Sequence, residues 1–168
     1  MTPLRVCSND AVDLEGQFHS VLAALLSATG AMRTTVRIDI PSIGWSVNRP
    51  CAEVLAPGAR SMRADEAIDH RRAQTIRWID RNRVTLVQPD LRSAGKTAPP
   101  SELITLFGAG SQIVAPLFGA DQYLVGWVSA HFSEVKKNFS EPDKVAVESA
   151  RDTIGSLLGK QPHLSDPE

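Results

Sequence analysis

The alternation of hydrophobic and polar residues is clearest between residues 111 and 140. Two apolar runs, Ile113 to Phe118 and Leu124 to Phe132, flank the turn-forming cluster Gly119 to Gln122. This pattern predicts a β-hairpin with a four- or five-residue connection. Everything else in the chain can be placed relative to this hairpin.

The two faces of the second apolar run differ in chemistry, because successive side chains of a strand point in opposite directions. One face carries Leu124, Gly126, Val128, Ala130 and Phe132, and the other carries Val125, Trp127, Ser129 and His131. Residues 33–40 alternate in the same way, which predicts a strand that Pro41 ends. Its apolar face has Thr34, Val36, Ile38 and Ile40, and its polar face has Arg33, Thr35, Arg37 and Asp39. We expect helices to cover the apolar faces, with Gly126 and Ala130 making room for them, and a pocket to form on the polar ones.

Two segments near the chain ends repeat their apolar residues at helical spacing. The first helix is predicted from Asp13 to Thr29, with Gly30 ending it. Its stripe is Leu14, Phe18, Val21, Leu22, Leu25 and Leu26. The second is predicted to begin at Ser140, as part of a capping box with Asp143, and to end near Leu158. Its stripe is Ala146, Ala150, Ile154, Leu157 and Leu158. Such stripes are a common pairing surface, so we expect a homodimer through the terminal helices.

The middle of the chain gives weaker patterns. Short extended pieces are predicted at 44–48 and 52–56, an amphipathic helix at 65–82, a short strand at 83–87 and a short helix at 101–107. Residues 91–100 form a loop long enough to be a flap. We therefore expect one domain over residues 11–159, with flexible tails at 1–10 and 160–168.

Composition narrows the class of protein. The 168 residues are 42% hydrophobic and 22% charged, which is ordinary for a soluble globular domain with its own core. The sequence has neither an export signal nor a run of apolar residues that would cross a membrane, so we expect a cytoplasmic protein with no membrane partner. Cys7 and Cys51 belong to no metal or redox spacing, and we predict no cofactor and no metal site.

Charge is unevenly distributed although the net charge is −1. Seven arginines lie between Arg60 and Arg83, against four acidic residues. A solvated helix face explains this excess. No interleaved aromatic residues or recognition motif accompany it, so nucleic acid is not expected, and an acidic protein partner stays open.

The order of elements and three tracts of sequence resemble the GAF domain family. The tracts are Ser111 to Phe118 with Pro116, Tyr123 to His131 with Gly126, and Phe139 to Asp143. The resemblance spans residues 11 to 158 and implies an α+β fold. In this fold a central, mostly antiparallel sheet of five or six strands has the terminal helices on one face and a ligand pocket with loops and short helices on the other. It also implies that the strands at 33–40 and 124–132 are neighbours.

The resemblance leaves the function open, because one fold supports many functions. We find no equivalent of the Asn-Lys-Phe-Asp-Glu-type motif of cyclic-nucleotide-binding members. Neither cysteine precedes a histidine as in chromophore-bearing members, and two distant cysteines match the free methionine sulfoxide reductases of this fold poorly.

The polar strand faces then supply the candidate site. Arg37 suits a carboxylate or phosphate, Trp127 a flat ring, and His131 a hydrogen bond near neutral pH. The predicted ligand-binding residues are Arg37, Thr35, Trp127, Ser129, His131, Gln112, Trp45, Trp78 and Asp90. They predict a protein that senses or carries a small anionic metabolite, possibly an aromatic carboxylate.

Two alternatives stay open. A small cofactor-independent hydrolase, isomerase or lyase would use His131 and Asp39 as base and acid in the same pocket. An interaction module with an empty pocket is the third reading. Arg37 and Asp39, two residues apart on one face, also have the simpler interpretation of a salt bridge on the sheet surface.

Overall fold

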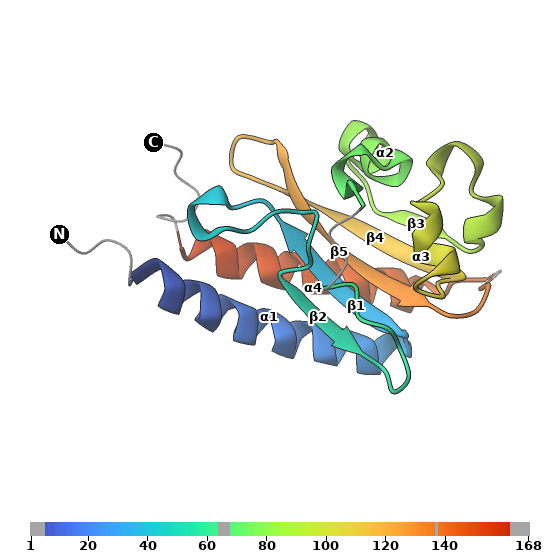
Figure 1. Cartoon of the computed structure of the whole chain (residues 1–168), viewed down its shortest axis with the longest axis horizontal. Coiled ribbons are helices and arrows are strands. Elements are labelled where there is room, and N and C mark those ends of the chain that lie inside the picture. The colour runs from blue at the N-terminus through green and yellow to red at the C-terminus, as the bar shows by residue number, and fades with distance from the viewer. Residues whose placement is uncertain (1–5, 64–67, 137, 162–168) are drawn as a thin grey trace.

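The computed structural model describes residues 6–63, 68–136 and 138–161, without the side chains of residues 6–10. Its centre is a five-stranded sheet with the order β2-β1-β5-β4-β3, in which all neighbouring strands are antiparallel (Figure 1). The strands are β1 (Arg33–Ile38), β2 (Ala52–Leu55), β3 (Leu86–Gln88), β4 (Ser111–Phe118) and β5 (Leu124–Phe132). This is the predicted α+β architecture, with five strands.

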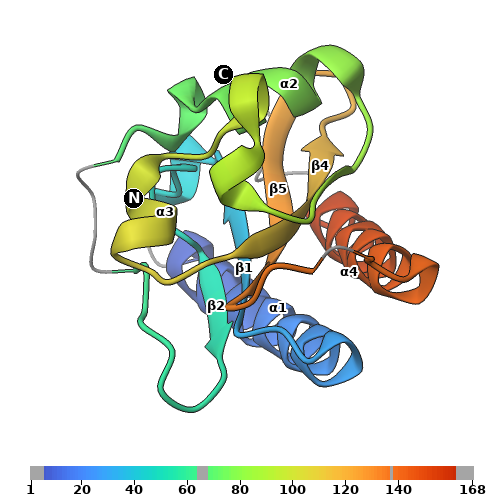
Figure 2. The ribbon, with the colours of Figure 1, turned by 90° about the vertical axis from the view of Figure 1, so that its right-hand side faces the viewer.

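Helices lie on both faces of the sheet. Figure 2 shows α1 (Val6–Thr29) and α4 (Glu141–Gly159) side by side on one face, with α2 (Gln74–Asn82) and α3 (Ser101–Thr105) on the other. The loops also contain four single turns of 3₁₀-helix. η1 (Pro41–Ile43) lies next to α1, and the other three are η2 (His70–Arg72), η3 (Leu91–Ser93) and η4 (Gly95–Thr97).

The strand faces are as the alternation predicts. β1 pairs with β5, so that Thr35 faces Ser129 and Arg37 faces Trp127 across the strands. The apolar face packs against α1 and α4 in the main core, where Val36 and Val128 are fully buried. The predicted hairpin turn is also confirmed, since the Gly119 N–H donates to the Tyr123 carbonyl at 2.9 Å.

The apolar stripes of both terminal helices are used in this core. Leu14, Phe18 and Leu22 of α1 and Ile154 of α4 are buried against the sheet. The stripes are therefore not available to a second copy of the chain. The dimer stays a prediction, and the exposed apolar residues of these helices lie on their outer faces, where Val12 and Val145 are 69% and 55% exposed.

Several predicted boundaries differ from the structure. The segment 65–82 is helical only from Gln74, because the polar run His70–Arg72 interrupts the apolar spacing between Ile68 and Ile76. Residues 65–67 of this predicted helix lie outside the described residues. Residues 44–48 form no strand, and only an isolated bridge joins Trp45 to Ile40.

The chain ends also differ in detail. α1 begins at Val6, inside the segment predicted as a tail, and Gly30 ends it with a left-handed φ of +68°. α4 begins after Ser140 as predicted, but the Ser140 side chain makes no capping bond. The tails predicted at residues 1–5 and 162–168 lie outside the described residues.

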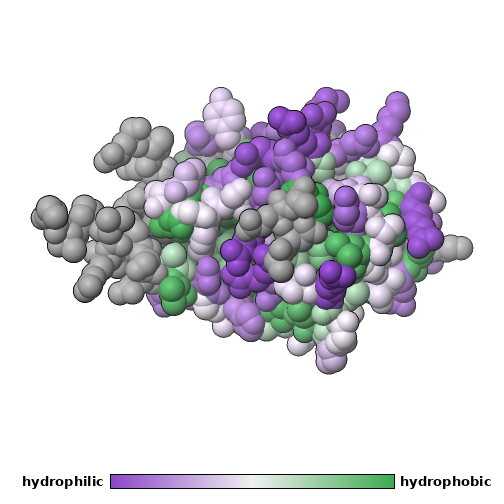
Figure 3. Space-filling model, in the orientation of Figure 1, coloured by the Kyte–Doolittle hydropathy of each residue, from purple (hydrophilic) through white to green (hydrophobic). Residues whose placement is uncertain are grey.

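The surface is mixed in character. Figure 3 shows hydrophilic residues gathered over α2, where Arg77, Asp80 and Arg81 are exposed. Nearby, Arg71 pairs with Asp39, and Arg72 pairs with Asp69 at 3.2 Å. These contacts fit the interpretation of the arginine-rich segment as a solvated surface. In the described part of the chain, no helix is both long and apolar enough to span a bilayer.

Gly126 is required for a different reason from the one that the sequence suggests, which was to make room for a helix. A Cβ atom at this position would lie 2.0 Å from the carbonyl oxygen of Arg37 and 3.0 Å from the Cα atom of Ile38. The close neighbour is therefore the backbone of β1 and not a helix. Only glycine lets β1 and β5 approach this closely, and the approach places Arg37 next to Trp127.

We predict that Gly126→Ala lowers the free energy of unfolding by about 3 kcal/mol or more, because backbone atoms cannot move aside cheaply. The matched control is Gly155→Ala in α4, where the added Cβ would lie at an ordinary 3.7 Å from Leu117. That change should stabilise the protein by about 0.5–1 kcal/mol. Urea unfolding of both variants measures this, and equal effects would contradict the backbone contact.

Candidate functional site

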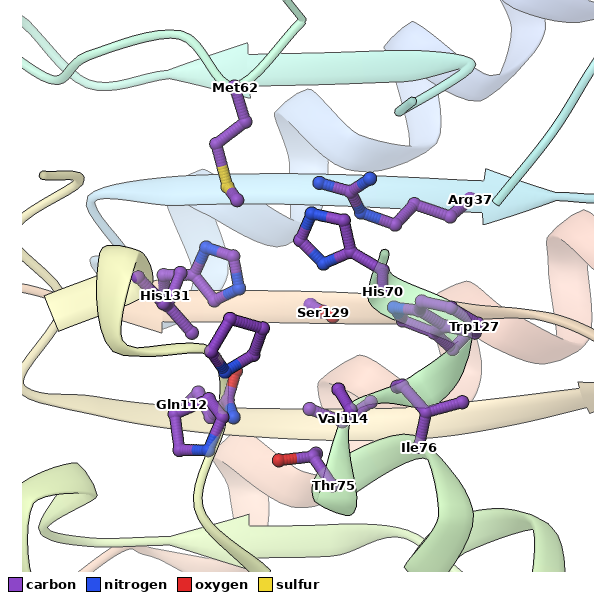
Figure 4. A pocket seen from close by; sticks show the side chains of 14 residues that line it. Arg37, Met62, His70, Thr75, Ile76, Gln112, Val114, Trp127, Ser129 and His131 are labelled. Carbon is purple, nitrogen blue, oxygen red and sulfur yellow. The ribbon is translucent and has the colours of Figure 1, made fainter. Parts of the chain in front are cut away.

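A cavity lies between the polar face of the sheet and the segments that cross it. Its volume is about 30 Å³, which is room for about two water molecules. The sheet contributes Arg37, Gln112, Val114, Trp127, Ser129 and His131. The rest of the lining, which we call the cover, consists of Met62, His70, Ala73, Thr75, Ile76, Pro99, Pro100 and Leu103 (Figure 4).

Arg33 organises one end of this site, although it does not line the cavity. Its side chain is fully buried, and its Nη2 atom donates to the carbonyls of Arg60 at 2.7 Å and Phe107 at 3.0 Å. The Nε atom donates to the Arg60 carbonyl as well, at 3.0 Å. Arg33 thereby ties the loop before the cover residue Met62, and the end of the α3 segment, to the sheet.

The same guanidinium determines the protonation of His131. Its Nη1 atom lies 3.2 Å from Nδ1 of His131. A guanidinium can only donate, so Nδ1 accepts the hydrogen bond and the ring proton is on Nε2. Burial lowers the pKa of His131 well below its usual value, and the nearby charges of Arg33 and Arg37 lower it further. His131 is therefore a neutral imidazole with an Nε2–H donor.

A second buried histidine comes from the cover. His70 is 8% exposed, and its backbone N–H is held by the Asn48 side chain at 3.1 Å. Burial, and next the charge of Arg37, lower the pKa of His70 to about 3. In Figure 4 the guanidinium of Arg37 extends toward the imidazole of His70, with His131 beyond it. Its Nη1 atom also donates to the carbonyl of Val47 at 2.9 Å.

Trp127 has two roles in this arrangement. Most of its ring packs in an apolar cluster with Val47, Ile76 and Val114. Its indole nitrogen is turned toward Ser129 and His70 in Figure 4. Trp127 therefore belongs both to this cluster and to the wall of the cavity, and its stacking on a flat ligand stays a prediction.

The structure brings together five of the residues predicted for the site: Arg37, Gln112, Trp127, Ser129 and His131. Thr35 lies on the same face opposite Ser129 and is 1% exposed, but it is not part of the cavity wall.

Four other predicted residues lie elsewhere. Trp45 packs against Phe18 of α1, with ring centroids 5.9 Å apart, and lines a separate cavity. Trp78 is half-buried against the cluster around Ile79. Asp90 caps the η3 turn, where its carboxylate accepts the Arg92 N–H at 3.1 Å.

Asp39 is the fourth of the predicted residues that lie elsewhere. Its carboxylate binds Arg71 and accepts the Val47 N–H at 2.9 Å, so the expected salt bridge with Arg37 is replaced by one with Arg71. Asp39 lines a cleft of about 170 Å³ that shares only Trp127 and Ile76 with the cavity of His131. The structure therefore does not bring together the acid and base of the enzyme reading.

Sequence reasoning predicted a flap at 91–100 and a short helix at 101–107, but it named no residue of the cover as part of the site, and His70 is the most important omission. His70 lies in the arginine-rich segment, which the sequence favours as solvated helix. The one available signal was the break in apolar spacing between Ile68 and Ile76, which marks a turn.

Cys51 is the cysteine whose side chain the structure describes, whereas the side chain of Cys7 lies outside the described residues. Burial raises the pKa of Cys51 to about 12, and its thiol donates to the Val36 carbonyl. No three histidine, cysteine or acidic side chains of the described segments are grouped so that they would hold a metal ion.

Comparison with known proteins identifies the fold. No protein-family model and no curated protein matches the sequence. Among solved structures, the cyanobacteriochrome receptor PixJ aligns with 90% of this chain and 99% of its own, at a TM-score of 0.71 and 18% identity. The Thermosynechococcus elongatus PixJ GAF domain, in its blue-light absorbing form, covers 93% of both chains at a TM-score of 0.63 and 16% identity.

An enzyme shares the same architecture. The type II free methionine-R-sulfoxide reductase from Thermoplasma acidophilum aligns with 90% of this chain and 96% of its own, at a TM-score of 0.63 and 14% identity. The chain therefore has the GAF fold, as the sequence tracts around Pro116 and Gly126 predict. Because the fold hosts both a photoreceptor and an enzyme, the function has to be argued from the cavity itself.

The buried histidines predict how stability depends on pH. Below about pH 6.5 the unfolded chain binds a proton on residue 70, whereas folded His70 stays neutral until about pH 3. Between these two pH values the unfolded state binds more protons than the folded state. The contribution of His70 to the free energy of unfolding is therefore fully present above about pH 6.5 and decreases as the pH falls. His131 acts in the same direction.

We predict that His70→Gln reduces the slope of unfolding free energy against pH by about 1.4 kcal/mol per pH unit between pH 6 and 4.5. Urea unfolding at several pH values measures the slope. The matched control is His19→Gln, which removes an imidazole from the exposed side of α1. A slope that is the same in His70→Gln and in the unmodified protein would contradict the burial of a neutral His70.

Proposed function

We propose that the protein binds a small organic anion in the cavity, with Arg37 as its charged anchor. The observation that carries the proposal is the set of hydrogen-bond donors in the lining, with a guanidinium among them. Arg37 lines the cavity as a buried cation, and both histidines beside it are held neutral. Among the described residues of the lining there is no aspartate or glutamate. A buried guanidinium can form strong, charge-assisted hydrogen bonds with an anion such as a carboxylate.

The donors around Arg37 support the same ligand. The Nε2–H of His131 faces the cavity because Arg33 occupies Nδ1. Trp127 adds an indole N–H and Ser129 a hydroxyl. Carboxylate oxygens accept several hydrogen bonds at once, and bonds from charged donors are the strongest of these.

The size of the cavity restricts the ligand. A volume of about 30 Å³ holds about two water molecules, so a short aliphatic carboxylate requires the cover to shift slightly, and an aromatic ring would require a much larger movement. The aromatic ligand considered from the sequence is therefore not part of this proposal. We also propose that a homodimer through the terminal helices reports ligand binding. Because the apolar stripes are buried in the core, this dimer would use the outer faces of the helices and not the stripes that the sequence analysis expects.

Calorimetric titration with acetate tests the proposal. We expect acetate to bind, acetamide to bind more weakly because it lacks the charge, and Arg37→Met to lower the acetate affinity at least tenfold. Arg71→Met is the matched control, because Arg71 is 58% exposed and lies outside the cavity. It should leave the affinity unchanged.

Two results would refute this function. One is equal acetate affinity in Arg37→Met and in the unmodified protein. The other is no heat of binding for formate, acetate or propionate. Circular dichroism of Arg37→Met, with Arg37→Lys as a variant that keeps the charge, separates loss of binding from loss of fold.

A further inference from the structure

Four buried polar residues form a row across the pocket face. Arg33 of β1 is opposite His131 of β5, His131 is opposite Gln112 of β4, and Gln112 is opposite Gln88 of β3. Their exposed fractions are between 0% and 4%. Polar groups buried to this extent need hydrogen-bond partners, so the direction of each bond in the row can be followed from its two ends.

At one end Arg33 fixes His131. As described above, the Arg33 guanidinium donates to Nδ1, which leaves the proton of His131 on Nε2. His131 therefore presents a donor at its far side.

At the other end a backbone carbonyl fixes both glutamines. The carbonyl of Thr97 can only accept, and Nε2 of Gln88 donates to it at 2.7 Å. The Oε1 atom of Gln88 is consequently the end that meets Gln112, and it accepts from Nε2 of Gln112 at 2.7 Å. Both amide orientations follow from this chain of bonds. Gln112 is left with its Oε1 atom, an acceptor.

The row is interrupted between His131 and Gln112. Both residues line the cavity, and within the described residues neither Nε2 of His131 nor Oε1 of Gln112 has a hydrogen-bond partner. A donor and an acceptor on adjacent strands thus face the same space. A group that accepts from His131 and donates to Gln112 would complete the row.

We propose that the bound anion carries a hydroxyl group beside its carboxylate, so that the site recognises small 2-hydroxycarboxylates. This rests on the proposed function, with the carboxylate at Arg37 and the hydroxyl between His131 and Gln112. A hydroxyl both accepts and donates. A keto oxygen would only accept and would leave the Gln112 acceptor unmatched, whereas an ammonium would only donate and would leave the His131 N–H unmatched. An unmatched buried polar group lowers affinity.

Matched ligand pairs test this inference. Glycolate should bind the unmodified protein about tenfold more tightly than acetate, and lactate more tightly than pyruvate. Gln112→Met removes the acceptor at similar volume, so it should abolish the preference for glycolate and keep the acetate affinity. Gln17→Met, on the exposed side of α1, is the control and should keep the preference.

The outcomes separate the two proposals. Equal affinity for glycolate and acetate, or a glycolate preference that survives in Gln112→Met, would overturn the hydroxyl inference while the anion site stands. If neither compound binds, the proposed function fails and the inference fails with it. Should Gln112→Met not fold, the lactate and pyruvate comparison in the unmodified protein decides alone, and pyruvate binding as tightly as lactate would overturn the inference.

Discussion

The hydrogen bonds of the buried Arg33 guanidinium are the constraint on which the site depends. A guanidinium that is withdrawn from water must be satisfied by acceptors, because leaving it unpaired would cost several kcal/mol. Here the acceptors are the carbonyls of Arg60 and Phe107 and the ring of His131. Glu53 adds an ion pair at 4.0 Å. The Arg33 side chain thus holds two loops against the sheet and sets the tautomer of His131.

The chemistry of the cavity follows from this arrangement. Burial keeps His70 and His131 neutral. Arg37 is therefore the only cation among the described residues of the lining. From the opposite side, the Thr97 carbonyl orients Gln88 and Gln112. Donors therefore gather on the β1 and β5 side of the cavity and an acceptor on the β4 side. This polarity is a property of backbone and side-chain contacts together, and it is the basis for assigning a ligand class.

The sheet and its two unlike faces could be predicted because a strand has a period of two residues. The alternation in residues 33–40 and 124–132 placed Arg37, Ser129 and His131 on one face, and the terminal helices followed from their apolar stripes. The cover could not be predicted in this way. Its position is set by bonds to backbone carbonyls such as those of Arg60 and Thr97, which leave no mark on side-chain pattern.

The errors have physical causes too. An aromatic residue packs well in many places, so Trp45 and Trp78 gave no indication of which cluster they join. Asp90 is a residue type that also caps turns, and it does so here. Gly126 was correctly seen as a close approach, but the sequence does not show whether a helix or the neighbouring strand approaches it.

The protonation of His131 tests the central claim most directly. Two-bond proton–nitrogen NMR correlations, recorded on protein labelled with ¹⁵N at histidine, distinguish the two ring nitrogens and report which one carries the proton. The arrangement around Arg33 predicts an Nε2–H tautomer that stays neutral from pH 7.5 to pH 5.5. A proton on Nδ1, or a titration with a midpoint near the ordinary histidine pKa, would contradict it.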